Sequence, residues 1–145
     1  IKDILSTIGE GIIISDTNGK FIQFNSAAIS MLGKGPVEIN PSEWPAYYGL
    51  YLPDGKTLHS ADQLPIQKAL RGETVKDEEL VIVTDSNEVK RILISAKPII
   101  DDAGTVIAGL INFRNITEFR HVEQAMKEVE EKYQELHDFL DKLRD

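Results

Sequence analysis

Short runs of apolar, β-branched and aromatic residues, broken by turn residues, fill much of the first 115 positions. The runs lie at residues 11–16, 20–25, 79–84, 90–100 and 106–113. Asn18 and Gly19 separate the first two runs and favour the positive φ angles that a tight hairpin needs. The pattern therefore predicts five strands, all linked by hairpins except between the second and the third. Pro98 cannot donate a ladder hydrogen bond, so the end of the fourth strand is expected at a bulge or an edge.

Helical patterns occupy the gaps between these runs. A one-sided apolar stripe predicts a short flanking helix over residues 1–9. Asn25 is placed to cap a helix over residues 26–32, and Gly33 suits its C-terminal end. A further helix is expected over residues 61–70. Between these two helices, residues 34–60 are rich in proline and aromatic residues, which indicates a long ordered excursion with short helical turns.

The last 29 residues carry a different pattern, in which apolar positions recur at alternating steps of three and four. This is the period of a coiled-coil seam, and the flanking positions are mostly charged. The eight seam positions are Phe119, Val122, Met126, Val129, Tyr133, Leu136, Leu140 and Leu143. The pattern predicts a helix that pairs with a second helix, and the alternative is a helix that folds back on its own sheet. The flanking charges do not decide between parallel and antiparallel pairing.

The two patterns meet at Asn115, Ile116, Thr117 and Glu118, where the last strand gives way to the charged helix. We expect a globular domain over residues 1–116, including the flanking helix, and a signalling helix over residues 117–145. Antiparallel strands with separate helices correspond to the α+β class.

Composition removes several classes of function. The chain has 145 residues, a formal net charge of −8 and no cysteine. An acidic chain repels the phosphates of nucleic acids, and no apolar run approaches the roughly 20 residues that span a bilayer. Without cysteine there is no disulfide, which agrees with a reducing, cytoplasmic location, and no cysteinyl-flavin photochemistry. We expect a module of a longer cytoplasmic protein, with no nucleic-acid partner and no membrane span in this fragment.

Taken together, the order and spacing of the motifs resemble the PAS sensor domain family, in the form found in bacterial sensor histidine kinases. The matching pieces are Glu10-Gly11-Ile12-Ile13-Ile14-Ser15-Asp16, Asn18-Gly19-Lys20, Asn25-Ser26-Ala27-Ala28, Leu32-Gly33, Leu52-Pro53-Asp54-Gly55, Leu64-Pro65-Ile66, Ala69-Leu70-Arg71-Gly72-Glu73, Ser95-Ala96-Lys97-Pro98-Ile99 and Asn115-Ile116-Thr117-Glu118.

The resemblance implies a five-stranded antiparallel sheet in the order 2-1-5-4-3, with helices cupped over one face to form a pocket. It also implies that the final motif couples the sheet to an output helix. Asn115 stands where the family has Asp, so an ion pair that the family makes there is replaced at most by amide hydrogen bonds.

A mostly apolar pocket suits a small ligand. The candidate lining is Ile14, Ile22, Phe24, Trp44, Tyr48, Tyr51, Leu64, Ile66, Ile82, Ile94, Leu110 and Asn112. The alternative is that these bulky side chains fill the core and contact each other. The sequence requires no cofactor.

Candidate chemistry is sparse. His137 is followed by an acidic residue, as in phosphoacceptor motifs, but the rest of such a motif is absent, and an exposed histidine is favoured. His59 lies ahead of a helix, where some PAS domains hold haem, yet one ligand is weak support and a surface or capping role is favoured. We predict no catalytic residues and no metal site.

These observations predict a sensory and dimerisation module, a homodimer through its C-terminal helix, that relays a change in the core to a downstream output domain. A histidine kinase is the expected parent. The alternatives are a ligand-free interaction domain, or a PAS module of another output protein such as a diguanylate cyclase.

Overall fold

The computed structural model describes residues 9–144. The chain divides into two compact units, which meet between Asn115 and Ile116, and each is described here by itself. The helix expected over residues 1–9 lies outside the described residues, apart from Gly9.

The first two strands form the predicted hairpin. β1 (Gly11–Asp16) pairs with β2 (Phe21–Phe24), and Oδ1 of Asp16 accepts hydrogen bonds from the backbone N–H groups of Asn18 and Lys20. Gly19 in the turn has a φ of 85°. Ile22 is an extra residue in β2, because Ile14 pairs with Gln23 and Ser15 with Phe21. The hairpin therefore contains a β-bulge at Ile22.

Asn25 joins this hairpin to helix α2 (Ser26–Leu32). Its Oδ1 accepts from the N–H groups of Ala28, in the first turn of α2, and of Ile12 in β1, each at 2.9 Å. Its Nδ2 donates to the carbonyl of Glu10 at 2.9 Å. Gly33 ends the helix in the left-handed conformation, so both predicted caps of this helix are confirmed.

The long excursion contains three short elements, η1 (Pro41–Glu43), α3 (Trp44–Tyr48) and the two-residue strand β3 (Leu50–Tyr51). Between α3 and β3, Gly49 has a φ of 69° and accepts a 2.8 Å hydrogen bond from the N–H of Val83. The backbone approach is so close that only glycine fits, since a Cβ there would stand 1.9 Å from the Val83 carbonyl oxygen.

The helix predicted over residues 61–70 is interrupted. It consists of η2 (Ala61–Gln63) and α4 (Pro65–Leu70). Leu64 between them has a ψ of 140°. A proline disfavours the helical region for the residue before it, so Pro65 forces this break while itself starting α4.

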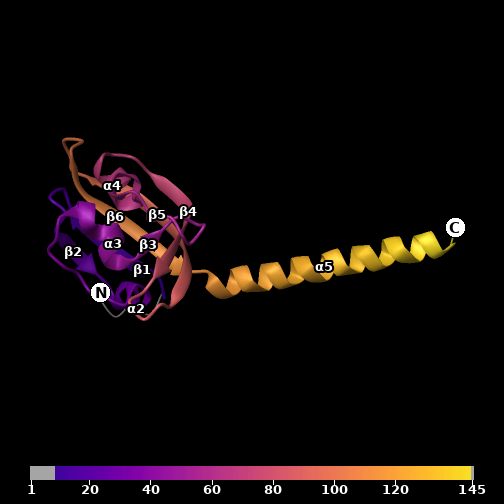
Figure 1. Ribbon diagram of the computed structural model, residues 1–145. Coiled ribbons are helices and arrows are strands. Elements are labelled where there is room, and N and C mark those ends of the chain that lie inside the picture. Colours follow the sequence, from indigo (N-terminus) through magenta and orange to yellow (C-terminus); the bar gives the residue numbers. More distant parts are fainter. Residues whose placement is uncertain (1–8, 145) are drawn as a thin grey trace. The chain divides into compact units, whose positions relative to one another are not determined.

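The remaining strands are β4 (Val75–Val83), β5 (Val89–Ile100) and β6 (Val106–Asn115). All pairs are antiparallel, and the sheet order is β2-β1-β6-β5-β4-β3 (Figure 1). The five predicted strands thus have the expected order, and β3 adds a sixth, which is too short for a sequence pattern. β4 begins at Val75, earlier than the predicted start at residue 79, because the charged residues around Asp77 do not show the apolar pattern of a strand. Asp77 lies at a register irregularity with a φ of 51°.

The fold class is confirmed as an antiparallel sheet with helices and a long C-terminal helix. α4 packs on β5 and β6, and α2 packs on β1. Pro98 pairs with Gly109 of β6, at a point where the pairing of β5 with β4 has already ended at Ala96. Pro98 therefore lies on a local edge, as predicted.

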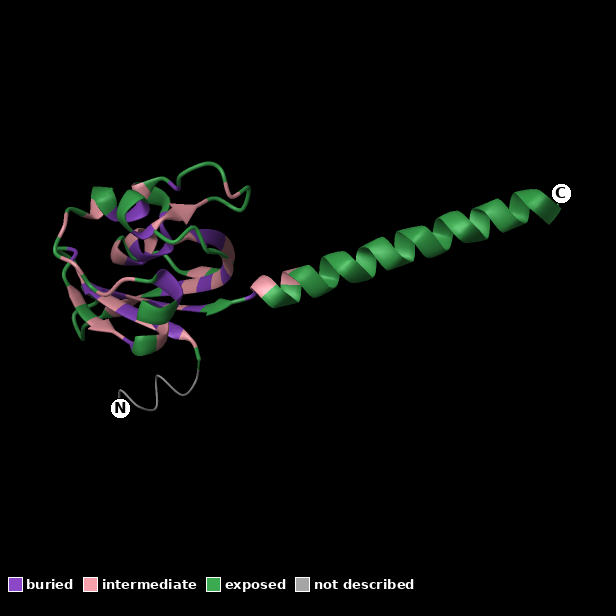
Figure 2. Ribbon diagram, turned by 60° about the horizontal axis from the view of Figure 1, so that its bottom comes forward, coloured by how far each residue is buried: buried purple, intermediate pink, exposed green. Residues whose placement is uncertain are grey.

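The second unit is helix α5 (Thr117–Arg144). From His121 to Arg144 every residue is exposed (Figure 2). Within residues 9–144, no helix has the length and apolar character needed to cross a membrane.

Candidate functional site

A small apolar cavity, partly open to solvent, lies in the globular unit. Its volume is about 50 Å³. Residues from the sheet and from the helices line it: Ile13, Phe21, Phe24, Leu32, Trp44, Tyr48, Leu50, Leu64, Pro65, Ile66, Leu80, Ile92, Ile94, Ile111 and Phe113. The cavity is therefore the space between the inner face of the sheet and the covering helices.

Aromatic rings make up one wall of the cavity. Phe21 stacks on Trp44 with ring centroids 5.2 Å apart, and it meets Phe24 edge to face at 5.3 Å. Tyr48 lies beside both phenylalanines, with centroids 6.4 and 6.2 Å away. Such pairs contribute roughly 0.5–1.5 kcal/mol each beyond the area that they bury, so this wall is cohesive.

Two polar groups are carried by this wall. The Tyr48 hydroxyl donates to the carbonyl of Gly35 at 2.8 Å, and burial, followed by the nearby Tyr47, raises the pKa of Tyr48 far above its usual value. Nε1 of Trp44 is buried and finds no hydrogen-bond partner among residues 9–144. A buried donor without an acceptor costs stability, and no polar atom is exposed to the cavity, so the indole N–H does not point into it.

The size of the cavity limits what it can hold. A volume of about 50 Å³ corresponds to one or two water-sized groups, whereas ligand pockets usually measure roughly 300–1,000 Å³. His59, the candidate haem ligand, is buried but is absent from the cavity lining. Its Nδ1 lies 2.8 Å from the carbonyl of Ser60. Because His59 is only 5% exposed, the surface position that the prediction allowed is wrong.

Half of the predicted pocket residues line this cavity: Phe24, Trp44, Tyr48, Leu64, Ile66 and Ile94. Ile82 is fully buried in the core nearby without lining the cavity. The other five were assigned to the inner face wrongly. They are Ile14, Ile22, Tyr51, Leu110 and Asn112.

Strand register explains these errors. Ile13 pairs with Ile111, and both line the cavity, so their neighbours Ile14 and Leu110, which pair with each other, lie on the opposite face. Asn112 follows the same alternation and donates to Oε2 of Glu10 at 3.3 Å.

The edge strands show the same effect. Ile22 sits on the bulge and is 61% exposed. Tyr51 alternates with Leu50, which lines the cavity. Sequence reasoning thus missed several lining residues, among them Ile13, Phe21 and Phe113. A glycine within the strand at position 11 could have indicated a bulky side chain packed on it. The ring of Phe113 covers Gly11 so closely that a Cβ there would lie 2.5 Å from Cζ of Phe113.

On α5 the eight predicted seam positions are all exposed, with exposed fractions between 45% and 70%. Phe139, outside the seam, is another exposed apolar residue that the pattern did not include. Polar groups pair along the helix, as Arg120 does with Glu123 and Gln134 with Asp138. His137 forms a 3.6 Å contact with Asp141 one turn on, in agreement with an exposed flanking role.

The predicted junction joins the two units through the backbone. Asn115 is the last residue of β6 and pairs with Ile92, which lines the cavity. Thr117 is the first residue of α5, and Glu118 lies in its first turn. Ile116 between them is buried, and its carbonyl accepts a 2.9 Å hydrogen bond from the N–H of Arg120.

Among the described residues no group of three or more His, Asp or Glu side chains is placed to hold a metal ion.

Comparison with solved structures finds the same fold in proteins of low sequence identity. A sensory box histidine kinase/response regulator from Burkholderia thailandensis is 15% identical, with a TM-score of 0.54 over 92% of this chain and 97% of that chain. The PAS domain of the fruit-fly ELK potassium channel is 14% identical, with a TM-score of 0.53 over 79% and 96%. The fungal blue-light photoreceptor Vivid is 18% identical, with a TM-score of 0.52 over 72% and 76%.

Such identities establish a common fold and nothing finer. No curated protein matches the sequence. The family model for the PAS domain matches residues 9–118, which is most of the chain and ends within the junction. By this match, together with the sheet order and the covering helices, the chain belongs to the PAS domain family.

Proposed function

We propose that the chain is a sensory and dimerisation module of a cytoplasmic signal-transduction protein, with a histidine kinase as the favoured parent. Its core responds to a stimulus, α5 pairs with α5 of a second copy, and the change passes through residues 115–118 to an output domain. The cysteine-free composition supports a reducing compartment.

The seam of α5 is the observation that carries this proposal. Eight apolar side chains with unbroken three-four spacing are exposed on one helix. An isolated helix is marginal in water, and burying one such side chain fully is worth about 1.5–3 kcal/mol. A second copy of the same helix supplies the complementary seam, since knobs of one helix fit the holes of the other.

The position of β6 supports the relay. Ile111 and Phe113 of this strand line the cavity, and Asn115 at its end leads through Ile116 into α5. A change in the cavity that shifts β6 is therefore passed along continuous backbone. To move such an equilibrium, a stimulus must bind the two states with different free energies, about 1.4 kcal/mol per tenfold shift.

Cysteine cross-linking tests the pairing, because the chain has no cysteine of its own. In a parallel pair, Val122→Cys near the start of α5 forms a disulfide with itself, as does Leu143→Cys near its end. In an antiparallel pair, Val122→Cys instead links to Leu140→Cys when the two variants are mixed. Gln124→Cys, on the charged face, is the matched control and should not cross-link in either case. Failure of all seam cysteines to cross-link would contradict the proposal.

The small cavity favours a second candidate, an interaction domain that binds no ligand and only aligns partners. A volume of about 50 Å³ agrees with side chains that fill the core. Native mass spectrometry of freshly purified protein separates the candidates. A retained small mass supports ligand sensing, and a bare polypeptide mass at every concentration of added apolar compounds supports the ligand-free domain.

A further inference from the structure

A groove lies between the C-terminal end of α2 and the hairpin that joins β4 to β5. Its volume is about 260 Å³. Residues 32–34 line one side, and the other side includes Thr84, Glu88 and Lys90. Gly33 has no side chain, and a Cβ there would stand 3.5 Å from Cγ2 of Thr84 on the other side of the groove.

Leu32 connects this groove to the cavity. Among the described residues, it alone lines both. It is the last residue of α2 and is 6% exposed. A buried residue that borders two spaces is the wall between them, so the position of Leu32 decides whether the spaces communicate.

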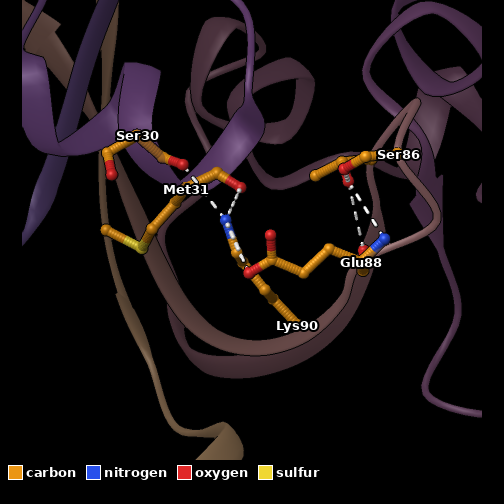
Figure 3. A network of polar contacts seen from close by, with 6 residues as sticks. Ser30, Met31, Ser86, Glu88 and Lys90 are labelled. Atoms are coloured by element: carbon orange, nitrogen blue, oxygen red, sulfur yellow. Dashed lines mark hydrogen bonds and ion pairs between the residues drawn. The ribbon is translucent and has the colours of Figure 1, made fainter.

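Lys90 fixes the turn of α2 that carries Leu32. Its Nζ donates to the carbonyls of Ser30 and Met31, each at 3.1 Å, and lies 3.5 Å from a carboxylate oxygen of Glu88 (Figure 3). The last carbonyls of a helix have no partner within the helix and carry the negative end of its dipole, so an ammonium group is well matched to them. The side chain of Lys90 is only 12% exposed, which strengthens these bonds.

Lys34 makes other polar contacts near Leu32, but none of them is to α2. Lys34 donates to the Tyr47 carbonyl at 2.8 Å and pairs with Asp85 at 3.1 Å, but Asp85 is largely exposed. Gly33, in the left-handed conformation, separates this lysine from α2. Lys90 is thus the main polar contact that holds the final turn of α2 against β5.

We propose that the groove is an access route to the cavity and that Lys90 keeps this route closed by holding Leu32 in place. When the bonds from Lys90 to Ser30 and Met31 break, the last turn of α2 moves about Gly33, and a small neutral molecule passes Leu32 from the groove. This inference goes beyond the proposed function, because it does not depend on the pairing of α5 or on any downstream domain.

Trp44 provides the readout, since it is the single tryptophan of the chain and lines the cavity. Acrylamide, a small neutral quencher, reports access to it in the full chain. For Lys90→Met we expect the quenching constant to rise at least about tenfold, because losing even one of its two charge-assisted hydrogen bonds corresponds to about this factor. Lys90→Arg keeps the charge and the donors and should stay near the wild-type value. Lys56→Met, an exposed lysine, is the control and should change nothing.

A double variant shows whether Lys90 acts through Leu32. Leu32→Ala alone should raise quenching, and adding Lys90→Met to it should raise quenching no further. Unchanged quenching in Lys90→Met, or an equal increase in the Leu32→Ala background, would overturn the proposal. If Lys90→Met does not fold, as judged by its near-ultraviolet circular dichroism, Leu32→Ala decides, and unchanged quenching in that variant overturns the proposal equally.

Discussion

Gly49 lies against Val83 so closely that a Cβ at Gly49 would stand 1.9 Å from the Val83 carbonyl oxygen. The carbonyl of the same glycine accepts a hydrogen bond from the Val83 N–H. β3 begins at the next residue, where the chain has come close enough to pair with β4. The excursion, which carries Trp44 and Tyr48 of the aromatic wall, is thereby attached to the sheet at a position that only glycine can occupy.

We expect Gly49→Ala to lower the free energy of unfolding by about 2–5 kcal/mol, the combined cost of a left-handed alanine and of overpacking against backbone. Gly104→Ala is the matched control, because Gly104 also has a positive φ of 84° but has nothing within 4 Å of a Cβ. It should cost only about 1–2 kcal/mol. Urea denaturation measures both, and equal losses would show that the close approach to Val83 is absent.

Ile13 and Ile14 form a matched pair for the inner face of β1. Ile13 is 4% exposed and lines the cavity, whereas Ile14 lies on the other face. Ile13→Ala should cost about 2–5 kcal/mol, as a core truncation does, and Ile14→Ala clearly less. The reverse order in chemical denaturation would place the opposite face of β1 inside.

Asn25 connects three segments through one side chain, since it bonds Ile12, Ala28 and Glu10. We expect Asn25→Ala to cost at least about 1–2 kcal/mol, the value of a lost helix cap, and to speed amide exchange at Ala28. Asn25→Asp keeps the accepting oxygens and should retain protection at Ala28. Unchanged amide exchange at Ala28 in the Asn25→Ala variant would show that the cap is not formed.

Asp54 makes the turn at residues 53–57 sensitive to acid. The Thr57 hydroxyl, and then the N–H groups of Thr57 and Lys56, donate to its carboxylate and lower its pKa from 3.8 to about 2. Because the folded pKa is depressed, the contribution of Asp54 to stability is present above about pH 4 and is lost as the pH falls toward 2. A carboxyl titration by NMR should show this low midpoint, and Thr57→Val should move it toward the ordinary value. A midpoint near 4 in the wild type would contradict these hydrogen bonds.

The extent to which the sequence predicts this fold differs between its parts. The hairpin at Asn18 and Gly19, the capped helix α2 and the long helix α5 follow from local signals, which act within a few residues. The inner face of β1 could not be predicted, because Ile12, Ile13 and Ile14 are all apolar and carry no alternation. In β6, Ile111 pairs with Ile13, and its neighbours Leu110 and Asn112 give no alternation that would identify the buried face.

The remaining differences come from tertiary structure. The bulge at Ile22 shifts the period of β2, so that Phe21 and Phe24, three residues apart, both face the cavity. β3 exists because Gly49 allows the chain to reach β4, and no local pattern encodes that approach. Lys90 contacts α2 across sixty positions, and a lysine near the start of a strand gives no sign of such a partner.

Sedimentation equilibrium of the full chain, compared with the Leu136→Glu variant, tests the pairing of α5 most directly. Leu136 lies in the seam, so a carboxylate there buries an unpaired charge between two helices, whereas Gln134→Glu on the outer face adds the same group in solvent. We expect the wild type and Gln134→Glu to sediment as dimers and Leu136→Glu as a monomer with an intact globular unit. A wild type that remains monomeric at high protein concentration, or a Leu136→Glu variant that remains dimeric, would contradict pairing through this seam.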